Sequence, residues 1–167
     1  MAAVEQFFHS EEIHPIDLVE SLASLREWDF DRVGDDQIAM AVEGQWRTYS
    51  LTLAWSGHDE TLRLICTFDC DPPEERVPEM LAAIEQANER VWTGCFNLWR
   101  EQKLMVFRYG LTLAGGAVAT PGQVEAMLRA ALGACERFYP AFQLVGWGGE
   151  RASDALSIAM NDAYGRA

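Results

Sequence analysis

The fold is decided by residues 37–68, which read QIAMAVEGQWRTYSLTLAWSGHDETLRLICTF. Apolar side chains recur at every second position in three runs of this stretch, and a short polar turn separates each run from the next. This period of two is typical of antiparallel strands that have one buried face and one wet face. The stretch therefore predicts three antiparallel strands, whose inward positions are Ile38, Met40, Val42, then Tyr49, Leu51, Leu53, Trp55, then Leu62, Leu64, Cys66, Phe68.

A second block of strands follows a helix. Residues 77–92 carry apolar side chains at helical spacing, and Gly94 is expected to end this helix in a left-handed conformation. Phe96 and Leu98 alternate in a short strand, and residues 104–113 alternate in a longer one. The order of three strands, helix and two strands predicts the α+β class, with an antiparallel five-stranded sheet packed with helices.

Three more helices are expected to pack against this sheet. Pro15 opens the first, and Thr120 to Gln123 form a capping box that opens the second. Pro140 is expected to end that second helix, and the third covers residues 153–164. Residues 28–33 also alternate and admit a further strand, but the break at residues 34–36 leaves them outside the five strands that we count.

Composition limits the classes of partner. The chain has 167 residues and a net charge of −13, which disfavours nucleic acid because phosphate backbones select for basic surfaces. The start of the chain lacks the pattern of a signal peptide, and no apolar run approaches the length of a membrane span. We expect a mobile N-terminal arm over residues 1–12, a single domain over residues 13–167, and a cytoplasmic location with reduced cysteines.

No cluster of residues predicts catalysis or metal binding. Cys66 and Cys70 do not have the spacing of a zinc motif, and histidine is present only at positions 9, 14 and 58. The acidic run of residues 69–75 admits a cation site, but it lacks the spacing of a calcium loop and is better interpreted as helix capping. We therefore expect no enzyme activity, no cofactor and no metal. Of the four cysteines, Cys70 has the position at which a thiol can be accessible, because it lies in a loop.

Three arginines also have two interpretations. Arg63, Arg100 and Arg108 on the predicted strands admit an anion-binding patch. The net acidity and the absence of a basic run favour a solvated face of the sheet instead.

A resemblance to a known family begins at residues 88–113. Asn88 ends a helix, Gly94, Phe96 and Leu98 follow, and residues 106–109 form a strand reading VFRY. This segment resembles the YbjN family, whose members are described as bacterial sensory-transduction regulators and whose fold is similar to that of type III secretion chaperones. The resemblance covers residues 14–164 and rests on structural positions. It implies a small, non-enzymatic bacterial protein that works by contact with other proteins.

The aromatic content suggests where such contact takes place. Tryptophans at positions 46, 55, 92, 99 and 147 exceed the needs of a core of this size, and aromatic side chains are enriched at interaction hot spots. We expect a homodimer whose surface includes Phe142, Trp147, Leu156 and Met160. The predicted function is a chaperone-like adaptor or regulator that holds a client protein. The alternative is a ligand-sensing module with a pocket between sheet and helices.

Overall fold

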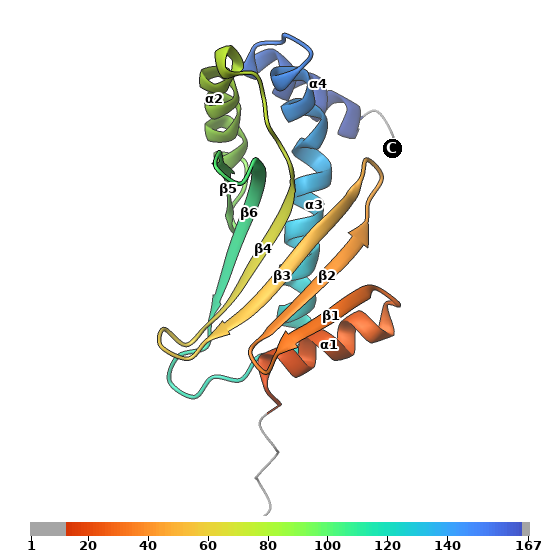
Figure 1. Cartoon of the computed structure of the whole chain (residues 1–167), viewed down its shortest axis with the longest axis vertical. Coiled ribbons are helices and arrows are strands. Elements are labelled where there is room, and N and C mark those ends of the chain that lie inside the picture. The colour runs from red at the N-terminus through yellow and green to blue at the C-terminus, as the bar shows by residue number, and fades with distance from the viewer. Residues whose placement is uncertain (1–12, 165–167) are drawn as a thin grey trace, which may run out of the picture.

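A six-stranded antiparallel sheet forms one layer of the molecule, and helices cover one of its faces (Figure 1). The computed structural model describes residues 13–164, so the predicted N-terminal arm of residues 1–12 lies outside the described residues. The strands are β1 (Asp29–Gly34), β2 (Gln37–Glu43), β3 (Thr48–Ser56), β4 (Thr61–Asp69), β5 (Cys95–Trp99) and β6 (Leu104–Thr112). The helices are α1 (Pro15–Leu25), α2 (Val77–Asn88), α3 (Pro121–Gly146) and α4 (Ala152–Tyr164), with a short 3₁₀ turn at Glu74–Arg76.

The two predicted blocks of strands join in one sheet. The strand order is β1-β2-β3-β4-β6-β5, and every neighbouring pair is antiparallel. Helix α2 connects β4 to β5, and β6 then returns to pair with β4. The α+β class and the joining of the blocks are confirmed, but the prediction of five strands is wrong.

The sixth strand is β1, which our count omitted. Five of its six residues are exposed, so the alternation of residues 28–33 does not correspond to a buried apolar face. Backbone pairing with β2 holds it at the edge of the sheet. Arg32 adds an anchor, because its guanidinium lies 2.9 Å from the carboxylate of Asp17 and 2.6 Å from that of Glu20, both on α1.

Burial explains why α3 continues past Pro140, where we expected it to end. A proline inside a helix removes one hydrogen bond and costs about 3 kcal/mol. On both sides of Pro140 the helix buries apolar residues at helical spacing, and these are Phe138, Ala141, Phe142 and Val145. Their packing offsets the cost, and the helix ends only at Gly146.

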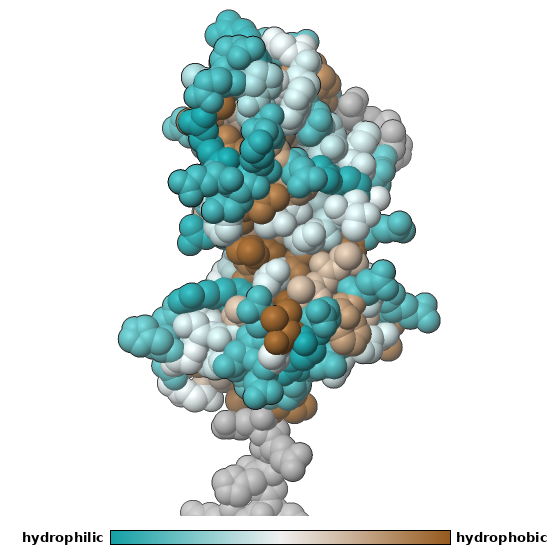
Figure 2. Space-filling model, in the orientation of Figure 1, coloured by the Kyte–Doolittle hydropathy of each residue, from teal (hydrophilic) through white to brown (hydrophobic). Residues whose placement is uncertain are grey.

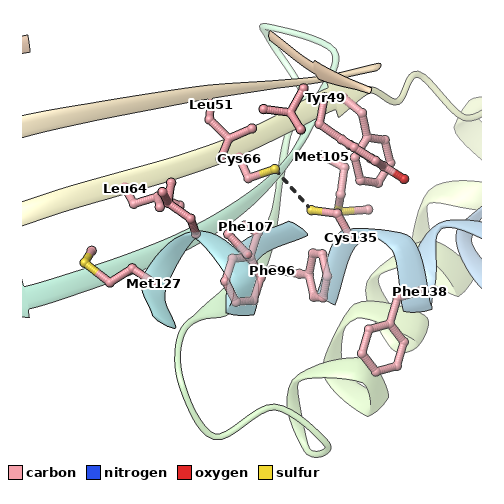
Figure 3. Packing of buried hydrophobic residues seen from close by; sticks show 14 of the residues in the cluster. Tyr49, Leu51, Leu64, Cys66, Phe96, Met105, Phe107, Met127, Cys135 and Phe138 are labelled. Carbon is pink, nitrogen blue, oxygen red and sulfur yellow. Dashed lines mark hydrogen bonds between the residues drawn. The ribbon is translucent and has the colours of Figure 1, made fainter. Parts of the chain in front are cut away.

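The space between sheet and helices is filled by large side chains. Phe96 and Phe107 pack edge to face with ring centroids 5.1 Å apart, and Phe138 lies 5.7 Å from Phe96. Figure 3 shows these rings beside Cys66 of β4 and Cys135 of α3, whose sulfur atoms are 3.6 Å apart. Helices α1, α2 and α3 contact the sheet, whereas α4 packs on α2 and α3.

The junction between α2 and β5 corrects one further expectation. Helix α2 ends at Asn88, and Gly94 lies six residues later with a φ of +96°. A Cβ atom at Gly94 would lie 2.5 Å from the backbone oxygen of Arg108, so only glycine fits there. Gly94 therefore sets the approach to β5 and does not cap the helix.

Asn88 ties the end of α2 to the edge of the sheet. Its Oδ1 accepts a hydrogen bond from the backbone N–H of Phe96 at 2.7 Å, and its Nδ2 donates to the carbonyl of Phe96 at 3.1 Å. One side chain thus satisfies both backbone groups of Phe96, as a neighbouring strand would.

Candidate functional site

The interaction surface predicted from the sequence is largely internal. Phe142 and Leu156 are fully buried, so the expectation that they lie on a surface is wrong. Trp147 is 51% exposed and Met160 is partly buried. The apolar end of α3 is covered by the chain itself, because Phe142 packs against Phe68 and Phe96 of the sheet and α2 and α4 pack against the helix.

Hydrogen bonds connect the start of α2 to the end of α3 and the start of α4. Arg76 donates from Nε to the carbonyl of Val145 at 2.8 Å and from Nη2 to the carbonyl of Glu150 at 2.5 Å. Glu79 of α2 accepts from the backbone N–H of Ala152 at 2.7 Å, which satisfies a donor in the first turn of α4. The apolar excess that suggested a dimer at this position therefore already has a partner inside the chain.

The tryptophans do not lie on one element. Trp92 in the loop after α2 is 98% exposed, whereas Trp46 lies in the β2–β3 hairpin and Trp147 at the end of α3. Trp55 and Trp99 are half-buried on β3 and β5.

A groove between α1 and α3 is the first candidate surface. We call it the α1–α3 groove, with a volume of about 370 Å³. Its apolar lining comes from Leu22, Trp28, Leu128 and Leu132, and Gly133 contributes an exposed stretch of helix backbone. Charged residues at positions 26, 125, 129 and 136 complete the lining.

The charges of the groove are arranged across the two helices. Arg26, directly after α1, pairs with Glu125 of α3, and the Arg26 guanidinium also lies 5.8 Å from the centre of the Trp28 ring. Glu136 is occupied by the β2–β3 hairpin, because it accepts the backbone N–H of Gln45 at 2.8 Å. Within residues 13–164, Arg129 takes part in no ion pair, so the groove offers one cation to a partner.

Gly133 is unusual for its position inside α3. Glycine in a helix interior costs about 1 kcal/mol relative to alanine. A Cβ atom at Gly133 would meet nothing within 4 Å, so the packing of this chain gives no reason for a glycine. The residue keeps one wall of the groove open.

The uncovered face of the sheet is the second candidate surface. Figure 2 shows brown and pale residues across the middle of this face and more polar groups above and below. A shallow hollow of about 680 Å³ crosses β4, β6 and β5 between Arg63, Ile65, Cys95, Trp99 and Arg108. The arginines for which we weighed an anion patch are thus partly brought together, since Arg63 and Arg108 share this hollow while Arg100 pairs with Glu74.

The groups considered for metal chemistry have other partners. The carboxylate of Asp69 lies 3.4 Å from the guanidinium of Arg47, and that of Asp71 lies 3.1 Å from the ammonium of Lys103. Glu74 forms an ion pair with Arg100. Among the described residues, no three His, Cys, Asp or Glu side chains converge as a metal site requires.

Cys70 is not the accessible thiol that its loop position suggested. Its side chain is 2% exposed, and burial raises its pKa to about 12. Among residues 13–164, Cys95 is the one cysteine that is not buried, and it lies on the uncovered face of the sheet.

Sequence reasoning missed the α1–α3 groove. Leu22 and Leu128 fit the apolar stripes of their helices, and the interpretation of these stripes as core is confirmed, since Leu128 is buried and Leu22 packs against the core. The packing of α1 against α3 is a tertiary contact with no local signal. Gly133 was the available clue, because it interrupts the helical pattern with no turn to justify it.

The comparisons with known proteins concern fold and family. A search among curated proteins found no match. Four chains of solved structures match. One is described as "Crystal structure of YbjN, a putative transcription regulator from E. coli"; it is 10% identical, covers 75% of this chain and 92% of its own length, and gives a TM-score of 0.54. At this identity the similarity shows the fold alone.

The family model gives the broader result. The model of YbjN, described as "Putative bacterial sensory transduction regulator", matches residues 15–144, which span α1 to the last turn of α3. This range includes both candidate surfaces and more than half of the chain. No helix among residues 13–164 has the length and apolar character needed to cross a bilayer. The chain belongs to the YbjN family.

Proposed function

We propose that this protein is a non-enzymatic regulatory adaptor that holds a segment of a client protein in the α1–α3 groove. The observation that carries the proposal is an open groove with an apolar lining and a charged rim. Such a surface suits a protein segment, because apolar side chains enter the groove while the backbone stays at the rim. The family description as a regulator agrees with a role exerted through binding.

The chemistry of the lining limits the client. Leu22, Leu128 and Leu132 favour one or two aliphatic or aromatic side chains. Arg129 favours a carboxylate beside them, since the other arginine of the groove already pairs with Glu125. We therefore expect an amphipathic segment with an acidic residue next to its apolar anchor.

Blocking the groove tests the proposal. Gly133→Trp places a large side chain in the groove, while Gly133→Ala leaves it nearly open and Ser157→Trp adds the same ring at an exposed position of α4. Affinity capture from the native cell extract, read by mass spectrometry, should retain one stoichiometric protein with the wild type and both controls but lose it with Gly133→Trp. A partner that binds Gly133→Trp as strongly as wild type would refute the groove as its site.

A second candidate function is ligand sensing, and one observation favours it. The groove volume of about 370 Å³ lies in the range of small-molecule sites, which is roughly 300–1,000 Å³. The space between sheet and helices, where the alternative function places its pocket, holds the aromatic cluster instead. Recovery of one small molecule from denatured wild type, but not from denatured Gly133→Trp, would favour ligand sensing over client binding.

The absence of enzyme activity, the cytoplasmic location and the likeness to type III secretion chaperones remain predictions. The first of these is supported by the chemistry, because catalysis needs a nucleophile, base or metal held in a site, and the buried or ion-paired groups described above have other roles.

A further inference from the structure

We propose that the uncovered face of the sheet binds a second copy of this chain, face to face, about a two-fold axis that runs along β3. This inference does not depend on the proposed function, because the α1–α3 groove lies on the helical side of the sheet. It replaces the surface at the end of α3 that the sequence had suggested for a dimer.

One row of residues crosses the whole sheet and carries the argument. The strand pairing connects, in order, Asp31, Ala39, Thr52, Ile65, Arg108 and Cys95, from β1 to β5. The inward-facing neighbours Ile38, Leu53 and Leu64 are buried under the helices, so this row lies on the uncovered face. An acidic side chain therefore stands at one side of the face and a basic side chain at the other.

The spacing of these charges is symmetric about β3. Asp31 lies two strands from Thr52 in one direction, and Arg108 lies two strands from Thr52 in the other. A two-fold axis along β3 exchanges the two sides of the sheet. It places Asp31 of each copy opposite Arg108 of the other, and Ala39 opposite Ile65. Two identical contacts result, about 19 Å apart if neighbouring strands lie about 4.8 Å apart.

Both charged groups are free to make this contact. Asp31 and Arg108 are exposed. Among residues 13–164 neither side chain takes part in a hydrogen bond or ion pair, whereas Arg26, Arg32, Arg47, Arg63 and Arg100 all have acidic partners. In a chain with 26 acidic and 13 basic residues, an arginine without a carboxylate partner is available for an acid from another molecule.

The centre of the face permits close approach. Around the axis, β2 and β3 present Ala39, Ala41, Ser50, Thr52 and Ala54, which carry no charge and project little. Two sheets that pack face to face keep their strands within about 30° of each other, so an axis close to the direction of β3 keeps them aligned.

The size of the face predicts a dimer of moderate strength. Six strands span about 24 Å and a seven-residue strand about 23 Å, so the flat footprint is about 550 Å² for each chain. Specific interfaces bury about 800 Å² for each partner, so this one belongs to the smaller class. We expect a dissociation constant of the dimer in the micromolar range.

Charge exchange between copies tests the proposal directly. Sedimentation from about 1 to about 300 µM should show a reversible monomer–dimer equilibrium for the wild type. Asp31→Arg and Arg108→Glu each place like charges at both contacts and should weaken the dimer at least about tenfold. Circular dichroism and urea unfolding establish that each variant is folded, as expected for exposed positions.

Mixing the two variants supplies the decisive comparison. A heterodimer of Asp31→Arg with Arg108→Glu has an Arg–Glu pair at one contact and the native Asp–Arg pair at the other. The mixture, and the double variant alone, should therefore recover dimerisation to within a few-fold of wild type. A monomeric wild type throughout this range, single variants that dimerise like wild type, or a mixture no stronger than its components would each overturn the proposal.

Discussion

The two faces of the sheet use the same strands for different purposes. On the covered face, Leu51, Leu64 and Phe107 are at most 1% exposed and pack under α1, α2 and α3. The residues that alternate with these along the strands lie on the uncovered face, and they include the half-buried Thr52 and Ile65 and the exposed, charged Arg108. The comparison indicates that the covered face supplies most of the apolar packing, while the uncovered face keeps side chains accessible to other molecules.

The cysteines allow the largest contrast between the two faces to be measured. Cys66, Cys70 and Cys135 are buried, whereas Cys95 lies half-buried on the uncovered face. If labelling of the buried thiols requires an opening of about 4 kcal/mol, they should react about a thousandfold more slowly than Cys95. Native-state alkylation with iodoacetamide, read by peptide mass spectrometry, measures the four rates. Labelling of Cys70 at the rate of Cys95 would show that its loop opens freely.

The same thiols predict how stability depends on pH. Burial raises the pKa of Cys70 from 9.0 to about 12, and the hydrogen bond to Cys66 raises the pKa of Cys135. The folded state therefore holds these protons more tightly than the unfolded state. Their contribution to stability is complete below pH 9.0 and declines as the pH rises toward 12. Urea unfolding at several alkaline pH values should show this decline, and Cys70→Ala should make it shallower.

Two neighbouring residues on β4 sharpen the comparison at equal side-chain size. Leu64 is 1% exposed on the covered face, and Ile65 is half-buried on the uncovered face. Leu64→Ala should lower the free energy of unfolding by about 3 kcal/mol, since it removes contacts and leaves a cavity. Ile65→Ala should cost about 1 kcal/mol, because water and neighbouring side chains fill the vacated space.

Urea unfolding of both variants at low micromolar concentration, where the proposed dimer dissociates, gives the comparison. Equal losses would mean that the uncovered face contributes to the stability of the monomer as strongly as the core does.

How much of this fold the sequence predicts depends on whether a segment has a buried face. Strands β2, β3 and β4 were predicted because their alternation records burial on one side. Strand β1 was not counted although residues 28–33 alternate, because residues 34–36 break the pattern and because backbone pairing and the ion pairs of Arg32, which leave no apolar period, hold the strand. The prediction that α3 ends at Pro140 was wrong because the packing of Phe138 and Phe142 stabilises the helix by more than the proline destabilises it.

The candidate surfaces were harder to predict than the fold. Phe142 and Leu156 were assigned to a surface because their helices looked more apolar than one core required. The structure shows that Phe142 packs against Phe68 of β4 and Phe96 of β5, and that α4 folds back onto α2 and α3 with Leu156 buried. The row from Asp31 to Arg108 depends on the register of four strand pairs, which no local pattern specifies.

A further expected effect concerns the edge where the covering helices meet the sheet. Asn88→Ala removes the two hydrogen bonds that its side chain makes with Phe96, at 2.7 and 3.1 Å, and leaves a backbone donor and acceptor without protein partners. This change should lower the free energy of unfolding by about 1–3 kcal/mol. Asn88→Asp keeps the acceptor for the N–H of Phe96 and should cost less. The matched control is Asn97→Ala on β5 itself, because the side chain of Asn97 accepts only a weak contact from Cys95 at 3.7 Å. Hydrogen exchange at the Phe96 amide should accelerate in Asn88→Ala and stay near wild type in Asn97→Ala. If the two alanine variants prove equally stable, α2 is held to the sheet by its apolar face alone.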